Sequence, residues 1–312
     1  MRIVFMGSSG FACPSLECLL GSGEDEVVAV VTQPDRPKGR RLEVSGCPVK
    51  QYLGKRSIPV LSPENVNASG SLESLRGYKP DAMVVVAYGQ LLKPALLALP
   101  RLGCVNVHGS LLPKYRGAAP IQWAIANGET VTGVTTMYID ERMDAGDVIL
   151  RREVPVGPEF TGGELHDVLA HVGAELLRET MNLLRAGKAP RWPQDEAEAT
   201  YAPKLSKMDS RLDWNLPATT IHNRVRAFNP WPGCCCEIPR ESGMRVKIVK
   251  TRVEPSEGRP GIVVEAKGDG ILVQAGGGAG LRLLEVQPEG RKPMSGAAFL
   301  RGHSTVAGVE VG

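Results

Sequence analysis

Three polar residues in the first half of the chain are of types that can carry out chemistry together: Asn106, His108 and Asp144. An imidazole gives or takes a proton near neutral pH. A carboxylate can hold that imidazole in place and stabilise its charged form. An asparagine amide can donate a hydrogen bond to an oxyanion that develops during a reaction. The three residue types therefore predict a site that stabilises an oxyanion and moves a proton.

The local pattern places two of these residues side by side. Val105 and Val107 alternate with Asn106 and His108, which is typical of the end of a strand that runs out into Gly109. Residues two apart in a strand share a face, so the amide and the imidazole are expected on the same face. An isolated pair of this kind is more often a satisfied core histidine beside a turn asparagine. The long context that follows favours the functional interpretation.

The surrounding sequence alternates short apolar runs with helical segments, which predicts a βαβ order. Buried parallel strands are expected at residues 3–6, 27–31, 58–60, 82–86 and 104–107. Helices are expected at residues 13–20, 49–56, 69–76 and 120–126, followed by strands at 132–139 and 148–156 and a long helix at 163–186. This order predicts an α/β fold with a Rossmann-like doubly wound, mostly parallel sheet. Such sheets bind ligands beyond the carboxyl ends of their strands, which is where His108 falls.

The last third of the chain has a different pattern. Residues 188–207 contain three prolines and no clear periodicity, so they are expected to be a linker. A short helix is expected at 221–228, and strands at 246–253, 261–265, 271–274 and 281–286 are separated by Gly and Pro turns. Several short strands of this kind predict a small β-barrel. The expected organisation is a first domain at 1–187, the linker at 188–207 and a second domain at 208–312.

Composition excludes several classes of protein. An apolar fraction of 42% is typical of an ordinary soluble protein, and the longest apolar runs are too short to span a bilayer. The chain begins with a strand and Gly7 rather than a signal peptide, so a cytoplasmic location is expected. The seven cysteines include no C-x-x-C pair and are expected to be reduced, small apolar residues. The net charge of +3 does not suggest nucleic acid, but the four cations within residues 36–41 do.

Several long motifs resemble one family. The run VNVHGSLLPKYRGAAPIQWAI from Val105, with MDAGDVI from Met143, is similar to the 10-formyltetrahydrofolate-dependent formyltransferases. VTQPDRP from Val31, VVVAYG from Val84, KLSK from Lys204 and RAFNPWP from Arg226 are similar to the methionyl-tRNA formyltransferase branch of that family. The resemblance covers nearly the whole chain and thins after about residue 233. It implies transfer of a formyl group from 10-formyltetrahydrofolate to the α-amino group of methionyl initiator tRNA, for translation initiation.

The resemblance also implies roles for individual residues. Asn106, His108 and Asp144 match the catalytic residues, and the D-x-G-D pattern selects Asp144 over Asp140 and Asp147. No metal is expected. The residues expected to bind the folate are Tyr88, Gly89, Leu91, Ser110, Leu111, Leu112 and Pro113. Those expected to bind the tRNA are Arg36, Lys38, Arg40, Arg41, Lys204 and Lys207. A basic face could be extended by Arg224, Arg226, Arg245, Lys247, Lys250 and Arg252.

The same resemblance implies a catalytic domain at 1–187, an OB-like tRNA-binding domain at 208–312 and a monomer. This chain departs from the family pattern at two places. Gly7-Ser8-Ser9-Gly10 stands where G-T-P is usual, and Leu42-Glu43 follows Arg41 where more basic residues are usual. Three alternatives stay open: a formyltransferase acting on an amino sugar nucleotide, a hydrolase that releases formate from the folate, and a non-catalytic RNA-binding protein.

Overall fold

The computed structural model describes residues 1–38, 43–54, 56–239, 243–303 and 305–312. This part of the chain forms two compact units. Unit 1 consists of Met1–Pro120, Val131–Pro155 and His166–Ala202, and unit 2 consists of Ile121–Thr130, Val156–Leu165 and Pro203–Gly312. Unit 1 therefore extends through residue 202, well into the segment that the sequence predicts as a linker.

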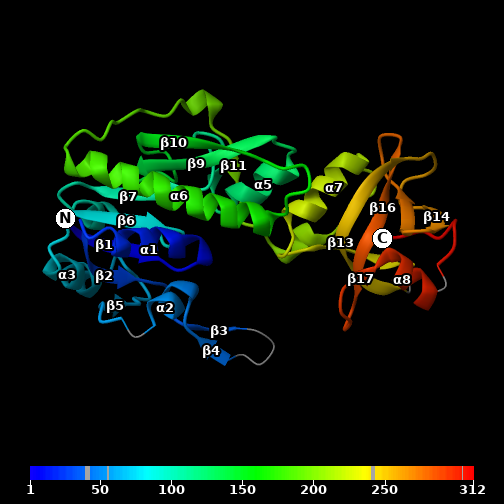
Figure 1. Ribbon diagram of the computed structural model, residues 1–312, viewed down its shortest axis with the longest axis horizontal. Coiled ribbons are helices and arrows are strands. Elements are labelled where there is room, and N and C mark those ends of the chain that lie inside the picture. Colours follow the sequence, from blue (N-terminus) through cyan, green and yellow to red (C-terminus); the bar gives the residue numbers. More distant parts are fainter. Residues whose placement is uncertain (39–42, 55, 240–242, 304) are drawn as a thin grey trace. The chain divides into compact units, whose positions relative to one another are not determined.

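Unit 1 is built on a seven-stranded sheet with the order β10-β9-β7-β6-β1-β2-β5 (Figure 1). The five strands from β5 to β7 run parallel, and β9 and β10 are antiparallel to their neighbours. The expectation of a mostly parallel α/β fold is confirmed. The strands are β1 (Arg2–Gly7), β2 (Glu26–Val31), β5 (Val60–Leu61), β6 (Ala82–Val86), β7 (Cys104–His108), β9 (Val131–Tyr138) and β10 (Val148–Pro155).

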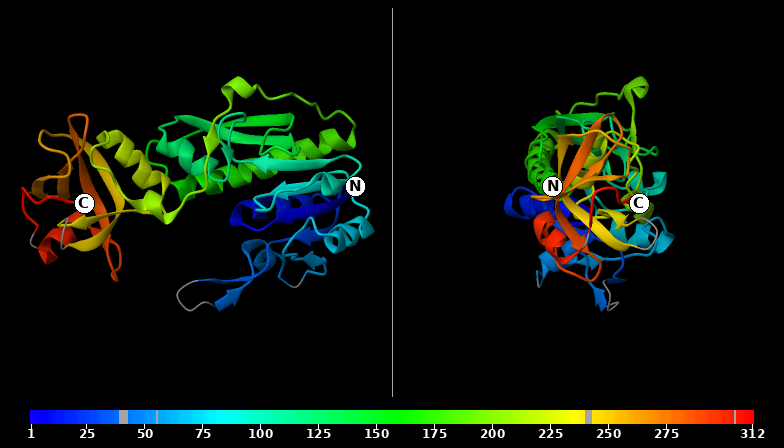
Figure 2. Two further views of the ribbon diagram at one scale, coloured as in Figure 1. Left: turned by 180° about the vertical axis from the view of Figure 1, so that it is seen from behind. Right: turned by 90° about the vertical axis from the view of Figure 1, so that its right-hand side faces the viewer.

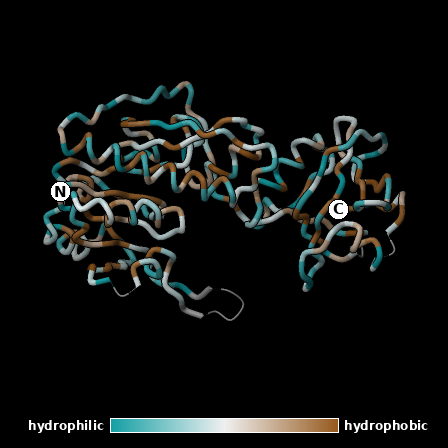
Figure 3. The backbone as a smooth tube through the Cα atoms, viewed as in Figure 1, coloured by the Kyte–Doolittle hydropathy of each residue, from teal (hydrophilic) through white to brown (hydrophobic). Residues whose placement is uncertain are grey.

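Helices cover both faces of this sheet (Figures 1 and 2). The central strands are apolar along nearly their whole length, as Figure 3 shows, because both of their faces are buried. On one face Val4 and Met6 of β1 pack in a cluster with Leu75 of α3 and Leu96 of α4. The helices of this unit are α1 (Cys13–Gly21), α2 (Pro48–Leu53), α3 (Ser69–Gly77), α4 (Pro94–Leu97) and most of α6 (Gly162–Arg185), with short 3-10 turns η1 (Gly10–Ala12) and η2 (Glu196–Glu198). Helix α5 (Pro120–Ala126) belongs to unit 2 from its second residue on.

The opposite face of β7 is covered by α6. Gly173 of α6 lies against Val107 and Val134, so close that a Cβ there would be 2.9 Å from Val107 Cγ1. The hydroxyls of Thr136 in β9 and Thr180 in α6 are 2.7 Å apart and buried. Two small two-stranded sheets complete the unit. One joins β3 (Arg36–Lys38) to β4 (Glu43–Ser45), and the other joins β8 (Arg116–Gly117) to β11 (Tyr201–Ala202).

Unit 2 contains an antiparallel sheet with the order β12-β13-β16-β15-β14, in which β17 also pairs with β16. The last residues of the chain form backbone hydrogen bonds with the two outermost strands of this sheet, β12 and β14. Glu237 of β12 exchanges backbone hydrogen bonds with Gly312, and Val263 of β14 donates to Val309. The elements are η3 (Lys207–Ser210), α7 (Ala218–Ala227), β12 (Cys234–Ile238), β13 (Met244–Pro255), β14 (Val263–Lys267), β15 (Gly270–Gln274), β16 (Ala279–Pro288), β17 (Met294–Ser295) and α8 (Gly296–Gly302).

In the described residues no helix combines the length and the apolar character that crossing a membrane would require.

Candidate active site

Strand β7 brings Asn106 and His108 to the same face of the unit 1 sheet. Asn106 pairs with Val85 of β6 on one side and Met137 of β9 on the other. His108 pairs with Thr135 of β9 at the carboxyl end of the strand. Since Val107 faces α6, the two polar side chains lie on the face away from that helix. The pattern of the sequence predicts this placement.

His108 is buried and held from two sides. Its Nε2 atom lies 2.9 Å from the carbonyl oxygen of Tyr115. A carbonyl only accepts hydrogen bonds, so Nε2 carries a hydrogen and donates it. The other ring nitrogen, Nδ1, lies 3.7 Å from Oδ2 of Asp144. A protonated imidazole would therefore direct both of its N–H groups at oxygen acceptors.

Asp144 reaches the imidazole from a tight turn between β9 and β10. Its backbone has φ of 51°, in the left-handed region that side chains other than glycine adopt at a cost. Oδ2 also accepts a 2.8 Å hydrogen bond from the backbone N–H of Gly117. Asp140 pairs with Arg142 and Asp147 with Arg191. The structure thus places Asp144, rather than either neighbouring aspartate, against His108.

Asn106 is half-buried and keeps its amide free. Within the described residues its side chain makes no hydrogen bond. A half-buried amide without a partner is available to a bound molecule, since an amide offers both donor and acceptor atoms. An oxyanion formed next to His108 could accept a hydrogen bond from it.

The predicted folate-binding turn after β7 is fixed by Thr135. The Thr135 hydroxyl donates to the Ser110 carbonyl oxygen at 2.7 Å and accepts from the Leu112 N–H at 3.1 Å. Ser110 is fully buried, and its own hydroxyl donates to the Lys114 carbonyl oxygen at 2.6 Å. The Ser110 hydroxyl therefore stabilises the turn by donating its hydrogen within it. Leu111 is half-buried, and Leu112 and Pro113 are buried.

The predicted folate-binding residues after β6 differ strongly in exposure. Tyr88 is buried, and its carbonyl oxygen accepts hydrogen bonds from the Ser8 hydroxyl and the Gln33 side chain. Its phenolic hydroxyl is buried without a hydrogen-bond partner in the described chain, and burial raises the pKa of Tyr88 to about 12. Gly89 is exposed and has φ of 92°, and Leu91 is 66% exposed. Leu91 therefore offers apolar surface beside the end of β6.

The predicted tRNA-binding residues fall into two groups. Lys204 and Lys207 are exposed and form no ion pair with any described residue, and Arg36 is exposed at the start of β3. Arg40, Arg41 and the side chain of Lys38 lie outside the described residues.

Several residues of the possible basic face have other partners. Arg245 donates to Cys235 Sγ, and Lys247 donates to the Pro230 carbonyl oxygen. Arg226 is buried in unit 2 and donates to the carbonyl oxygens of Gly157 and Phe160. Arg252 pairs with Glu254 at 2.6 Å. These residues are correspondingly less available to a polyanion, because their charges are already engaged.

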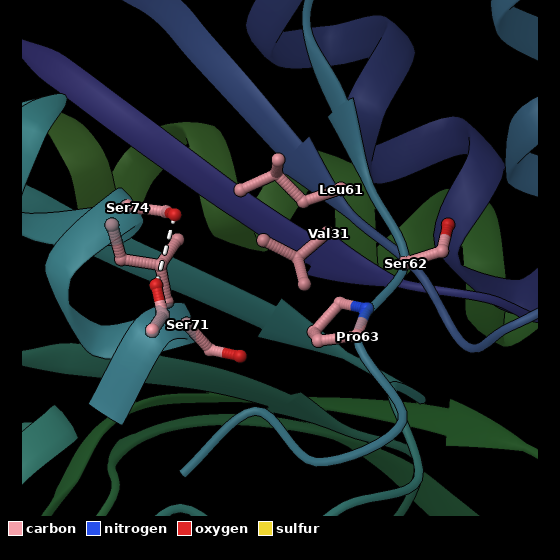
Figure 4. Close-up of a pocket in the computed structure, with 8 residues that line it drawn as sticks. Val31, Leu61, Ser62, Pro63, Ser71 and Ser74 are labelled. Carbon is pink, nitrogen blue, oxygen red and sulfur yellow. Dashed lines mark hydrogen bonds between the residues drawn. The ribbon is translucent and has the colours of Figure 1, made fainter. Parts of the chain in front are cut away.

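A cavity of about 340 Å³ lies elsewhere in unit 1 (Figure 4). It is formed by the ends of β2 and β5 and the first turns of α3, and none of its lining residues is charged. The strands β1 and β6 separate β2 from β7 in the sheet. The cavity is therefore distinct from the place where His108 and Asp144 meet. The described residues also contain no cluster of three or more His, Cys, Asp or Glu side chains suited to a metal ion.

Sequence reasoning did not single out several residues that build the site. Tyr115 and Gly117 supply the backbone groups that bind His108 and Asp144, and both lie in the motif that carries the resemblance. Gln194 donates to two carbonyl oxygens of the Asp144 turn. Nothing in the sequence pattern marks Gln194, because it lies in the segment predicted to be a linker.

Two family models match most of the chain. A family model described as "Formyl transferase" matches residues 1–181, and one described as "Formyl transferase, C-terminal domain" matches residues 204–304. A curated protein of Moorella thermoacetica named methionyl-tRNA formyltransferase is 48% identical over 314 aligned residues, covering 100% of this chain and 99% of that protein.

Solved structures share the fold at lower identity. A structure described as WlaRD, a sugar 3N-formyl transferase in the presence of dTDP and 5-N-formyl-THF, has a TM-score of 0.67 at 17% identity, covering 94% of this chain and 99% of that one. HypX from Aquifex aeolicus, in complex with tetrahydrofolic acid, has a TM-score of 0.63 at 20% identity, covering 96% of this chain and 47% of that one. Full-length similarity and both family matches lead to one conclusion: this chain belongs to the formyl transferase family, and within it to the methionyl-tRNA formyltransferases.

Proposed function

We propose that this chain transfers the formyl group of 10-formyltetrahydrofolate to the α-amino group of methionyl initiator tRNA, a step of translation initiation. The observation that carries the proposal is the meeting of His108 and Asp144 beside the free amide of Asn106, in a chain 48% identical to a protein named for this activity.

The geometry suits attack of an amine on a formyl carbon. The attack forms a C–N bond and a tetrahedral intermediate whose former carbonyl oxygen carries negative charge. Asn106 can donate a hydrogen bond to that oxygen, and a protonated His108 can do so after one of its N–H groups turns away from the Tyr115 carbonyl oxygen or from Asp144. Collapse breaks the bond from the formyl carbon to N10 of the folate. The proton lost by the amine passes to N10, directly or through water, with His108 and Asp144 as the groups that can move it.

The folate would bind at the carboxyl ends of β6 and β7. Tyr88, Gly89 and Leu91 follow β6, and residues 110–113 follow β7, which is its parallel neighbour. A flat heterocycle needs backbone donors and acceptors at its edge and apolar cover on its faces. The exposed Leu91 can supply apolar cover. Solved relatives of this fold that contain tetrahydrofolic acid or 5-N-formyl-THF support a folate co-substrate.

We further assign tRNA binding to the C-terminal part of the chain and to the basic segment at Arg36, Lys38, Arg40 and Arg41. The hydrogen bonds from the chain's last residues to both β12 and β14 support an OB-like, barrel-type second domain. The exposed Lys204 and Lys207 can contact phosphates without first breaking an ion pair. The proposed boundaries remain 1–187, 188–207 and 208–312, for a monomer acting in the cytoplasm.

One assay tests the proposal. Purified protein is given 10-formyltetrahydrofolate with methionyl initiator tRNA, methionyl elongator tRNA or free methionine, and formylated product and formate are measured separately. Formylation confined to the initiator tRNA supports the proposal. Formate release without formylated tRNA would indicate a hydrolase instead. Formylation of an amino sugar nucleotide, but not of tRNA, would assign a different acceptor.

A further inference from the structure

A polar network connects the Asp144 turn to the loop that holds His108. The side-chain N–H groups of Gln194 donate to the carbonyl oxygens of Asp144, at 2.9 Å, and of Gly146, at 2.8 Å. The side-chain oxygen of Gln194 accepts from Nε and Nη2 of Arg116, at 3.1 and 3.0 Å. The Gln194 amide thus bridges the two segments, with its nitrogen bound to the Asp144 turn and its oxygen bound to Arg116.

Arg116 is placed for this role by its neighbours. Its side chain is only 2% exposed, and it follows Tyr115, whose carbonyl oxygen accepts from His108. Arg116 also forms two hydrogen bonds with Glu196, which holds the pKa of that carboxyl below its usual range and keeps the pair charged near neutral pH. A buried guanidinium with paired acceptors is rigid, because several of its N–H groups are fixed at once.

Backbone bonds tie the same segment to the catalytic loop. Thr200 accepts from the Tyr115 N–H with its hydroxyl and from the Arg116 N–H with its carbonyl oxygen. The parallel pair β8 and β11 continues this contact through Gly117 and Ala202. Residues 194–202 therefore lie along the loop that binds His108, while the Gln194 side chain reaches the turn that carries Asp144.

The turn needs such support. Asp144 has an unfavourable positive φ, which persists only where the surroundings impose it. Its carboxylate must also lie at hydrogen-bonding distance from Gly117 and face Nδ1 of His108 at the same time. A displacement of about 1 Å in a catalytic group can lower a rate about 100-fold.

We propose that Gln194, held by Arg116, is a positioning residue that fixes the Asp144 turn against His108. The inference rests on the proposed function for its kinetic readout. The side chain of Gln194 donates to backbone carbonyl oxygens of the turn, and it affects the reaction only by setting the position of Asp144.

Two substitutions separate the parts of this role. Gln194→Ala removes both ends of the bridge. Gln194→Glu keeps an acceptor for Arg116 but loses the donors to the Asp144 and Gly146 carbonyls. Both are expected to lower kcat about 10- to 100-fold, with the KM for methionyl-tRNA changed less than about 3-fold. Glu198→Ala is the matched control. The side chain of Glu198 is exposed and forms no hydrogen bond or ion pair with a described residue, so kcat should stay within about 2-fold.

A double-mutant cycle shows whether the effect passes through Asp144. In an Asp144→Asn background, Gln194→Ala should cause no further loss beyond about 2-fold, because the group that it positions is already disabled. General loosening of the fold would instead give the same loss in both backgrounds and would overturn the proposal. Unchanged kcat for Gln194→Ala would overturn it as well.

Amide hydrogen exchange provides a readout that needs no substrate. Exchange in residues 140–147 should be faster in Gln194→Ala than in the unmodified protein or in Glu198→Ala. Equal exchange in all three would contradict the positioning role. Failure of the proposed function is seen separately, as an absence of formyl transfer to methionyl-tRNA by the unmodified protein.

Discussion

Nδ1 of His108 and Oδ2 of Asp144 lie 3.7 Å apart, and each group also forms a hydrogen bond with the backbone. The other imidazole nitrogen donates to the Tyr115 carbonyl oxygen, and the same carboxylate oxygen accepts from the Gly117 N–H. Both of these backbone partners belong to residues 113–117, so a single loop sets the orientation of the two groups. The loop thereby couples the position of the imidazole to that of the carboxylate.

His108→Ala should lower kcat for formyl transfer about 10²- to 10⁴-fold, the usual range for a general acid or base. The affinity for methionyl-tRNA should stay nearly unchanged, because His108 is buried and remote in sequence from the proposed phosphate contacts. Steady-state kinetics and filter binding measure the two effects. Full activity of this variant would show that the chain does not use His108 chemically.

Asn106→Asp keeps the shape of the side chain but removes its N–H donor. If the amide stabilises the oxyanion, kcat should fall about 10²- to 10³-fold, since this is the usual cost of removing one such donor. Asn182→Asp is the comparison. Asn182 is exposed on α6 and its side-chain oxygen accepts from Arg185, an acceptor that an aspartate keeps, so a change in transfer rate of this size is not expected. Similar rates for Asn106→Asp and the unmodified protein would exclude the oxyanion role.

Salt dependence tests the two exposed lysines of the KLSK segment. Each phosphate contact contributes about 0.7–0.9 to the slope of log K against log salt concentration, through release of counterions. Lys204→Ala and Lys207→Ala should each reduce that slope for methionyl-tRNA by about this amount. Lys188→Ala, an exposed lysine after α6, should leave it unchanged. Equal slopes in all four proteins would remove both residues from the phosphate contacts.

Gly146 is required for steric reasons, because a Cβ there would overlap the carbonyl oxygen of Tyr138. Gly146→Ala should destabilise the protein by about 1–3 kcal/mol, the typical cost of overpacking. Since it displaces the Asp144 turn, kcat at a temperature where the variant is folded should fall too. Gly21→Ala meets no atom within 4 Å, and its stability should change by less than about 1 kcal/mol. Denaturant unfolding compares the two.

The stability of unit 2 should depend on pH through His222. Burial lowers the pKa of His222 below its ordinary value of 6.5, and its Nδ1 lies 2.9 Å from the Thr251 hydroxyl. The unfolded chain therefore binds a proton more readily, so stability is complete above about pH 6.5 and falls as the pH decreases through the lower folded pKa. His222→Gln should flatten the dependence of Tm on pH in this window. An unchanged slope would show that His222 does not contribute to it.

The sequence by itself determined the elements that carry the site. Continuous apolar runs mark the buried strands, and β6 and α5 have the predicted bounds. The alternation around Asn106 and His108 fixed their shared face, because side chains alternate along a strand whatever surrounds it. The long motifs, from Val31 to Pro232, identified the family because each of them can be recognised along the chain without knowledge of the fold.

Other elements of the fold escaped prediction because their residues have weak local preferences. Strand β12 begins at three consecutive cysteines, which do not alternate in polarity, and the hairpin β3–β4 contains Pro37 and basic residues. The helix predicted at 49–56 ends at Leu53, where Gly54 has φ of 55°. Pairing with neighbouring strands and turn geometry decided these elements.

Only the tertiary structure showed what holds His108 and Asp144 in place. It brings Gln194, which is 50 residues from Asp144, to the carbonyls of the catalytic turn, and it brings Thr200 to Tyr115. It also shows that the Ser110 hydroxyl and the Arg226 guanidinium donate to backbone carbonyl oxygens within the protein. Hydrogen bonds between distant segments depend on how the chain packs, and no local periodicity records them. Local pattern thus determined which residues could react, and long-range packing decided which residues orient them.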